Sequence, residues 1–188
     1  MNSHTTVSKF IHWTFTLLYA YGIFKQVDDL SELEDTSILN FEILFAIVFL
    51  IIVLVRYFYM KDTPTLLGAN NHIPKGHLFI AKTVHRLVYF SLIMLPTSGL
   101  LIAVVFNLSM SGIEVAIALH EFSAFLSYVV IALHVSASLY SRFKGEGMWN
   151  AMVPIWQETE KNNSKLISKL EEFEYKVYEK IEKVFSLK

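Results

Sequence analysis

The chain has 188 residues, 54% of them hydrophobic, and its 16 basic residues nearly balance its 17 acidic ones. This composition, with a mean hydropathy of +0.44, is too apolar for a water-soluble domain of this length and indicates an integral membrane protein. The absence of cysteine excludes disulfides, thiolate-ligated iron–sulfur clusters and covalently attached c-type haem. No basic stripe with interleaved aromatic residues suggests a nucleic-acid partner.

Four apolar stretches follow one another along the first three quarters of the chain. They run from Phe10 to Phe24, Ile38 to Tyr59, Leu78 to Phe106 and Ile113 to Tyr140. With its flanks, each reaches the ~20 residues needed to cross a bilayer as a helix. The sequence therefore predicts an all-α fold, an integral membrane four-helix bundle over residues 1–144, with helices at about 8–26, 38–60, 78–106 and 113–141.

The charged residues predict the orientation of this bundle. The segment Lys25 to Ser37 carries five carboxylates and one lysine, and the link Asn107 to Gly112 has no basic residue. Basic residues gather at the opposite helix ends: Lys9, Arg56, Lys61, Lys75, Lys82, Arg86, Arg142 and Lys144. Because basic residues favour the cytoplasmic side, we expect both termini to be cytoplasmic.

The composition changes after the fourth stretch. Residues 145–156 contain Gly145, Gly147 and Pro154, which interrupt helices, and we interpret them as a connector. Over residues 157–188, apolar residues recur at helical spacing among Lys and Glu, namely Leu166, Leu170, Phe173, Val177, Ile181 and Val184. This pattern predicts a cytoplasmic amphipathic helix. It could lie along the membrane, pair with a second copy in a homodimer, or dock a specific partner.

Histidines within the apolar stretches are the first candidate site. His120 and His134 are fourteen residues apart, which on a helix separates them by roughly 21 Å while turning the second to within ~40° of the first. His12 lies near the predicted cytoplasmic end of the first stretch, at a depth similar to that of His134. Ionisable side chains inside a membrane are costly and usually functional. We therefore expect His12 and His134 to bind one haem iron from opposite sides, and His120 to serve a second haem position.

Short motifs around these histidines resemble the bacterial cytochrome b561 family and the related cytochrome b subunits of membrane hydrogenases and formate dehydrogenases. The resemblance runs from about residue 8 to residue 144. The matching segments are Ser8-Lys9-Phe10-Ile11-His12-Trp13, Val55-Arg56, His85 with Leu95-Pro96 and Gly99-Leu100, Leu119-His120-Glu121, and Leu133-His134. The resemblance implies a four-helix bundle in the bacterial cytoplasmic (inner) membrane. It also implies haem b, an iron ligated by His12 and His134, and a second iron ligated by His120.

One position departs from the family pattern. The second haem of the family needs a histidine about fourteen residues before the residue matching Arg56, and that position holds Glu42. Glu42 could act as an unusual carboxylate ligand, or Met110 could supply a thioether. Alternatively, Glu42 could pair with His120 in a space without haem. The resemblance therefore implies one haem b and leaves the second open.

Other basic residues are weaker candidates at the cytoplasmic ends. Arg56 and Arg86 suit haem propionates, although snorkelling to lipid phosphates explains them equally well. His85 and Lys82 could hydrogen-bond the carbonyl of a quinone, or simply anchor the interface.

The preferred function is a membrane b-type cytochrome that transfers electrons between the quinone pool and a redox partner, which could be periplasmic. The first alternative is a stand-alone superoxide oxidase, which would benefit from a basic outer surface. The longest outer loop is instead acidic, which favours a cationic protein partner. A haem-free membrane scaffold is the second alternative, and an absorption spectrum would distinguish it from the others.

Overall fold

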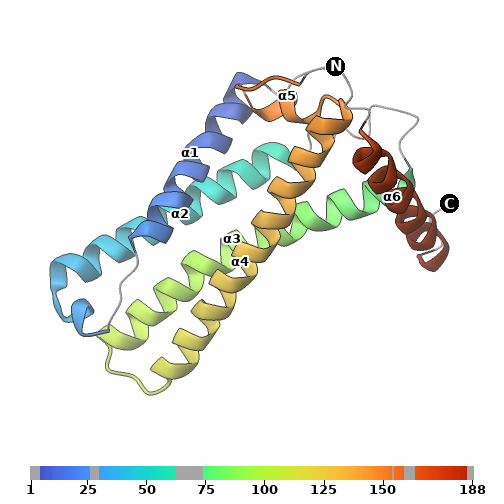
Figure 1. Ribbon diagram of the computed structural model, residues 1–188. Coiled ribbons are helices and arrows are strands. Elements are labelled where there is room, and N and C mark those ends of the chain that lie inside the picture. Colours follow the sequence, from blue (N-terminus) through green and yellow to red (C-terminus); the bar gives the residue numbers. More distant parts are fainter. Residues whose placement is uncertain (1–4, 26–29, 62–73, 154, 159–163, 186–188) are drawn as a thin grey trace. The chain divides into compact units, whose positions relative to one another are not determined.

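The structure, a computed structural model, describes residues 5–25, 30–61, 74–153, 155–158 and 164–185. Every regular element in these ranges is helical, which confirms the prediction of an all-α chain (Figure 1). In chain order the elements are α1 (Thr6–Phe24), the 3-10 helix η1 (Leu30–Glu34), α2 (Thr36–Met60), α3 (Lys75–Asn107), α4 (Ile113–Lys144), α5 (Met148–Met152) and α6 (Lys165–Val184).

Three of the described helices, α2, α3 and α4, are long and apolar enough to cross a membrane. Each exposes large apolar side chains such as Leu44, Phe90 and Phe125. A surface of this kind is what lipid requires of a spanning helix. The sequence predicted four spanning helices; α1 is not among the three, and its 19 residues include Lys9 and His12.

The chain forms two compact units, and α3 and α4 each contribute to both. The α1–α2 unit comprises α1, η1, α2, α3 from Val88 onward and α4 up to Ile131. The α6 unit comprises α3 up to Leu87, α4 from Ala132 onward, α5 and α6.

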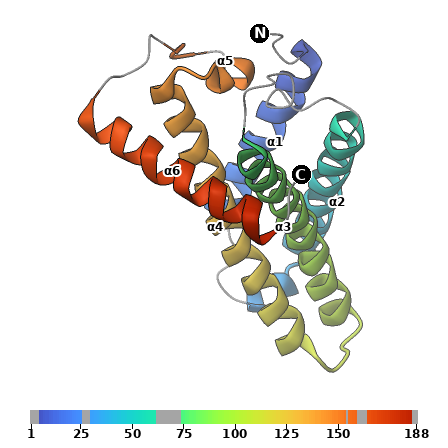
Figure 2. The ribbon, with the colours of Figure 1, turned by 90° about the vertical axis from the view of Figure 1, so that its right-hand side faces the viewer.

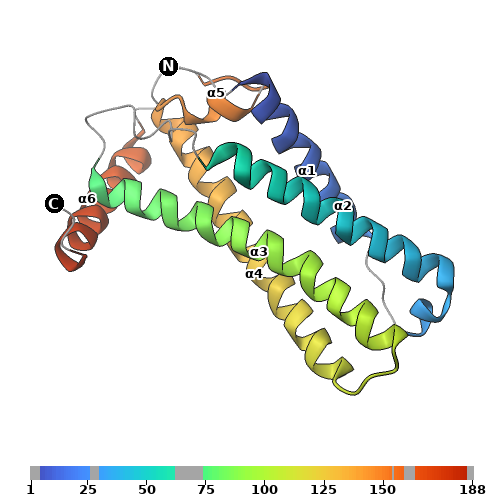
Figure 3. The same cartoon turned by 180° about the vertical axis from the view of Figure 1, so that it is seen from behind.

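In the α1–α2 unit, α1 and α2 run alongside each other in opposite directions (Figure 3). Their contact is built on Phe15, Phe49 and Val53, which join Leu92 of α3 in one buried cluster. A second cluster brings Leu33, Leu39 and Ala103 together and ties η1 to α2 and α3.

Local signals set several helix ends. Asp35 caps α2 by accepting a hydrogen bond from the Ser37 backbone N–H at 2.8 Å, and Ser164 caps α6 in the same manner through the N–H of Ile167. Gly112 precedes α4 with φ +102°, a backbone conformation that favours glycine. Such caps satisfy backbone groups that a helix leaves unpaired at its ends.

In the α6 unit, the segment after α4 is tied back to that helix. The guanidinium of Arg142 donates to the carbonyls of Trp156 and Gln157 at 3.0 and 3.2 Å and lies 3.6 Å from the Trp156 ring centroid. The predicted connector also contains the short helix α5, where the Glu158 carboxylate accepts a hydrogen bond from the Trp149 N–H at 2.8 Å. Helix α6 then crosses the start of α3 and the end of α4 (Figure 2).

Candidate functional site

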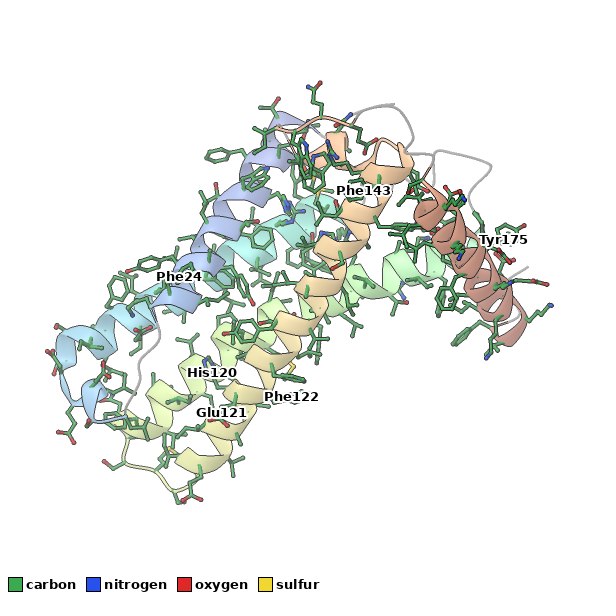
Figure 4. The ribbon with its side chains drawn as sticks, in the orientation of Figure 1. Phe24, His120, Glu121, Phe122, Phe143 and Tyr175 are labelled. Carbon is green, nitrogen blue, oxygen red and sulfur yellow. The ribbon has the colours of Figure 1, made fainter. Side chains whose placement is uncertain are left out.

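His120 lies on α4 and turns its ring toward α3 (Figure 4). Its Nδ1 is 3.0 Å from the hydroxyl oxygen of Ser98, which is 2% exposed. The Ser98 hydroxyl donates its own hydrogen to the carbonyl of Leu95 at 2.9 Å. The orientation of His120 is therefore set by a buried hydrogen bond from one helix to the next.

This arrangement suits one tautomer of a neutral His120 ring. The Ser98 hydroxyl has one hydrogen, and when the Leu95 carbonyl accepts it, the serine oxygen acts as the acceptor toward His120. Nδ1 then carries the imidazole proton, and Nε2 keeps its lone pair. A histidine that ligates a metal typically donates its other ring N–H to a neighbouring oxygen in this way.

A cavity of about 480 Å³ lies beside this histidine within the α1–α2 unit. Its walls are mostly apolar, and its polar lining includes His120, Glu42, Lys25 and Tyr19. Ligand sites are typically clefts of about 300–1,000 Å³ with mainly apolar walls and a few placed polar groups. The cavity and the oriented imidazole therefore fit a large, flat, mostly apolar group held by His120.

Glu42 lines the same cavity but forms an ion pair with Lys25, just beyond the end of α1. The Lys25 ammonium also lies 4.4 Å from the ring centroid of Phe41. His120 has Ser98 as its partner, so the direct Glu42–His120 pair considered above is not the arrangement found. Met110 is 54% exposed in the α3–α4 link and is not among the described residues that line the cavity.

Several serines of α3 and α4 are buried within the α1–α2 unit. Ser91, Ser98, Ser123 and Ser127 are each at most 2% exposed. Ser127 shares a 2.8 Å hydrogen bond with the hydroxyl of Tyr19, joining α4 to α1 beside the cavity. Small hydroxyl residues allow membrane helices to approach closely while satisfying polar partners.

His12 and Arg56 also lie in the α1–α2 unit. They are near the start of α1 and the end of α2, opposite the end where Lys25 pairs with Glu42. Arg56 donates from Nη1 to the Ser8 carbonyl at 3.3 Å, and its guanidinium carbon is 5.2 Å from the Phe15 ring centroid. The His12 ring packs edge-on against Phe15, with centroids 5.3 Å apart. His12 and Arg56 thus both contact Phe15, which places a candidate ligand close to a candidate propionate partner.

His134 lies in the α6 unit, where its ring meets that of His85 edge-on at 5.0 Å between centroids. His85 Nδ1 is 2.8 Å from the carbonyl of Ala81 on its own helix. Lys82 and Arg86 are exposed on the same helix. The structure therefore brings together His134 and a residue assigned above to quinone binding. The pairing of His12 with His134 stays a prediction.

Sequence reasoning missed Lys25, Ser98 and Tyr19 as parts of the cavity. Lys25 offered a signal, since it is the only basic residue among the carboxylates of its predicted loop. Ser98 and Tyr19 offered none, because a serine or tyrosine within an apolar stretch is an ordinary packing residue.

The chain matches the family model described as prokaryotic cytochrome b561 over residues 3–154. The match includes the described helices α1 to α5 and ends before α6. No curated protein and no solved structure matches the chain.

Proposed function

The chain belongs to the prokaryotic cytochrome b561 family, and on that premise we propose that it transfers electrons between membrane quinone and a redox protein partner through haem b. The spanning helices α2 to α4 hold the site within the membrane. A bound haem b supplies reversible one-electron transfer.

We assign His12 and His134 as the residues that would together hold one haem, with Arg56 as a partner for a propionate. His120 is the protein ligand on one side of a second position. By the resemblance, Glu42 stands where the family has the opposing histidine, and its ion pair with Lys25 compensates the charge of the carboxylate. Two neutral imidazoles on one iron leave no open position for oxygen chemistry, which suits electron transfer.

The observation that carries this proposal is the orientation of His120. A histidine that merely fills an apolar interior needs no cavity beside it. Here the ring is held by Ser98 next to a space of about 480 Å³, and the acceptor nitrogen is the one that a metal would use.

The charge near η1 supports a cationic protein partner. Glu32, Glu34 and Asp35 are all exposed there. An acidic surface attracts a basic protein and repels superoxide, so it favours the electron-transfer function over the superoxide oxidase. Reduction of the cytochrome by a basic redox protein should slow as salt is added, whereas reduction by an acidic redox protein should become faster, because salt screens attraction and repulsion alike.

The decisive experiment is haem content per polypeptide, measured as the pyridine haemochrome on purified protein, with reduced-minus-oxidised spectra of three variants. His134→Ala and His12→Ala should each remove the same b-type signal, because the two residues share one iron. His77→Ala serves as a matched control at the start of α3. A full low-spin spectrum in both His12→Ala and His134→Ala would refute the assignment, and wild-type protein free of haem would support the scaffold alternative.

A further inference from the structure

Carboxylates of helix α6 dock it on α3 and α4, in addition to apolar contacts such as the buried Ile167 and the ring of Phe185, 4.6 Å from that of Phe79. The Glu174 carboxylate accepts hydrogen bonds from the Lys144 ammonium at 2.7 Å and the Tyr140 hydroxyl at 3.1 Å, both on α4. Glu182 accepts from the backbone N–H of Gly76, the second residue of α3, at 2.8 Å. This polar face therefore fastens α6 to the ends of two helices that can span a membrane.

The contact at Gly76 is too close for any other residue. A Cβ added there would lie 2.6 Å from the carbonyl oxygen of Tyr178 and 2.8 Å from its Cα. The His77 ring lies 5.0 Å from that of Tyr178. Helix α6 is thus seated directly on the backbone of α3, at the first turn of a helix that is long and apolar enough to span a membrane.

One side of α6 carries a row of large apolar residues, which we call the apolar stripe. This side stays exposed because the helix docks through another side. Leu166, Phe173 and Val184 are each 67% exposed, and Leu170 is 41% exposed. Along the sequence these residues are separated by four, three and eleven positions. Each of these spacings returns to nearly the same side of a helix, so the four residues share one side. A stripe of this kind is normally covered by another apolar surface.

The lysines of α6 gather beside this stripe. At ~100° per residue, all five fall within about 60° of one another, on the flank opposite to the docked carboxylates across the stripe. They are Lys165, Lys169, Lys176, Lys180 and Lys183. Lys176 and Lys183 are 70% and 73% exposed, and each has a neighbouring glutamate one turn away. The exposed surface therefore combines an apolar centre with a basic edge.

An apolar groove of about 420 Å³ continues from this stripe toward α3 and α4. Leu170, Phe173 and Val177 line it from α6, and Ile80 and Tyr140 line it from the other two helices. Its one charged lining residue, Glu174, is already engaged by Lys144. The groove thus offers an apolar chain a place on the docked side of the stripe, across the stripe from the lysine flank.

We propose that α6 is an interfacial helix that binds the anionic phospholipid of the membrane in which the protein lies. Its stripe enters the acyl-chain boundary, its lysines meet the lipid phosphates, and the groove receives part of an acyl chain. An amphipathic helix with lysine beside an apolar face is suited to this position, and each lysine near an anionic surface adds to the attraction. The helix lies outside the family match, so the proposal does not depend on the haem assignment.

The absence of cysteine allows a clean labelling experiment on the full chain in lipid nanodiscs. Phe173→Cys and Leu166→Cys place a spin label on the stripe. Ser168→Cys is the matched control, because it is exposed on α6 but ~140° away from Phe173 around the helix. The accessibility of each label to oxygen and to a water-soluble nickel chelate is compared in discs of phosphatidylcholine alone and of phosphatidylcholine with phosphatidylglycerol.

In the anionic discs, labels at 166 and 173 should be more accessible to oxygen than to nickel, and the label at 168 should show the reverse. The double variant Lys169→Gln, Lys180→Gln should lower the ratio of membrane-immersed to water-exposed α6 about 25-fold, because each lysine contributes roughly a factor of five. Glu172→Gln with Glu179→Gln should raise it. Circular dichroism of each variant checks that the helices remain folded.

Three results would overturn the proposal. The first is nickel access at 166 and 173 equal to that at 168 in the anionic discs. The second is equal immersion in both lipid compositions, which would remove the assignment to anionic lipid. The third is strong dipolar coupling between labels at 173 on two chains, which would identify a second copy as the occupant of the stripe.

Discussion

Replacement of Glu174 by glutamine tests whether the carboxylate holds α6 in place. The side chain is 15% exposed and meets Lys144, Tyr140 and Tyr178. Glutamine keeps the shape and one oxygen acceptor but loses the charge. Lys144 retains a second partner, Glu146 at 2.5 Å, so the ammonium is not left without compensation.

The expected loss follows from these contacts. Hydrogen bonds that involve a charged group each contribute about 1.5–3 kcal/mol. Since glutamine preserves one acceptor and Lys144 keeps Glu146, we expect a net loss of ~2 kcal/mol, which corresponds to an increase of about 30-fold in the undocked fraction of α6. Glu172→Gln is the matched control, because its pair with Lys176 is exposed to solvent, which screens the two charges.

Hydrogen exchange of the α6 amides, measured by mass spectrometry in detergent without anionic lipid, reports the undocked fraction directly. Exchange should accelerate about 30-fold in Glu174→Gln and about twofold or less in Glu172→Gln. Equal acceleration in the two variants, or none in Glu174→Gln, would refute the role assigned to Glu174.

The pH dependence of docking has a definite sign. Burial alone would raise the pKa of the Glu174 carboxyl, but hydrogen bonds from Lys144 and Tyr178 outweigh burial and hold the pKa below its ordinary value. A lowered pKa means that the stabilisation is complete above the ordinary value of about 4.3 and is lost as the pH falls through the lower, docked value. Docking should therefore weaken in acid in the wild type and lose this dependence in Glu174→Gln.

Three further predictions concern the candidate haem site and the topology. Ser98→Ala should weaken haem binding at His120 about 10- to 100-fold in a haem titration, since it removes the acceptor of the ring N–H; Ser91→Ala, an equally buried serine bonded only within α3, should not. Glu42→His should raise the haem content per chain by supplying the missing imidazole, while Glu42→Gln should leave the His12–His134 spectrum intact, and two bis-histidine haems in the wild type would contradict this. A reporter active only in the cytoplasm should work after Lys188 and fail near Glu34, and the opposite pattern would reverse the predicted orientation.

Much of the architecture could be predicted from composition and periodicity, because these are local properties of the chain. A long run of apolar residues has to satisfy its backbone hydrogen bonds internally in lipid, so helices follow directly. That reasoning identified α2, α3 and α4 as spanning helices, whereas the resemblance to the family rested on the short motifs around the histidines. It does not suffice for α1, where Lys9 and His12 interrupt the apolar run.

The contacts that define the site could not be predicted, because each joins residues far apart in the sequence. Ser98 and His120 come from different helices, and Lys25, just beyond the end of α1, meets Glu42 of α2. Their spacing in the chain has no characteristic value, so only packing decides which hydroxyl orients the imidazole and which cation meets the carboxylate.

For the C-terminal helix α6 as well, the sequence determines one property and the tertiary structure another. The sequence by itself determined that α6 is amphipathic, since helical periodicity puts its apolar residues on one side. It could not determine which side docks. The tertiary structure decided this, because Tyr140 and Lys144 on α4 and the backbone N–H of Gly76 donate hydrogen bonds to carboxylates of α6. Satisfying those donors turns the apolar stripe outward.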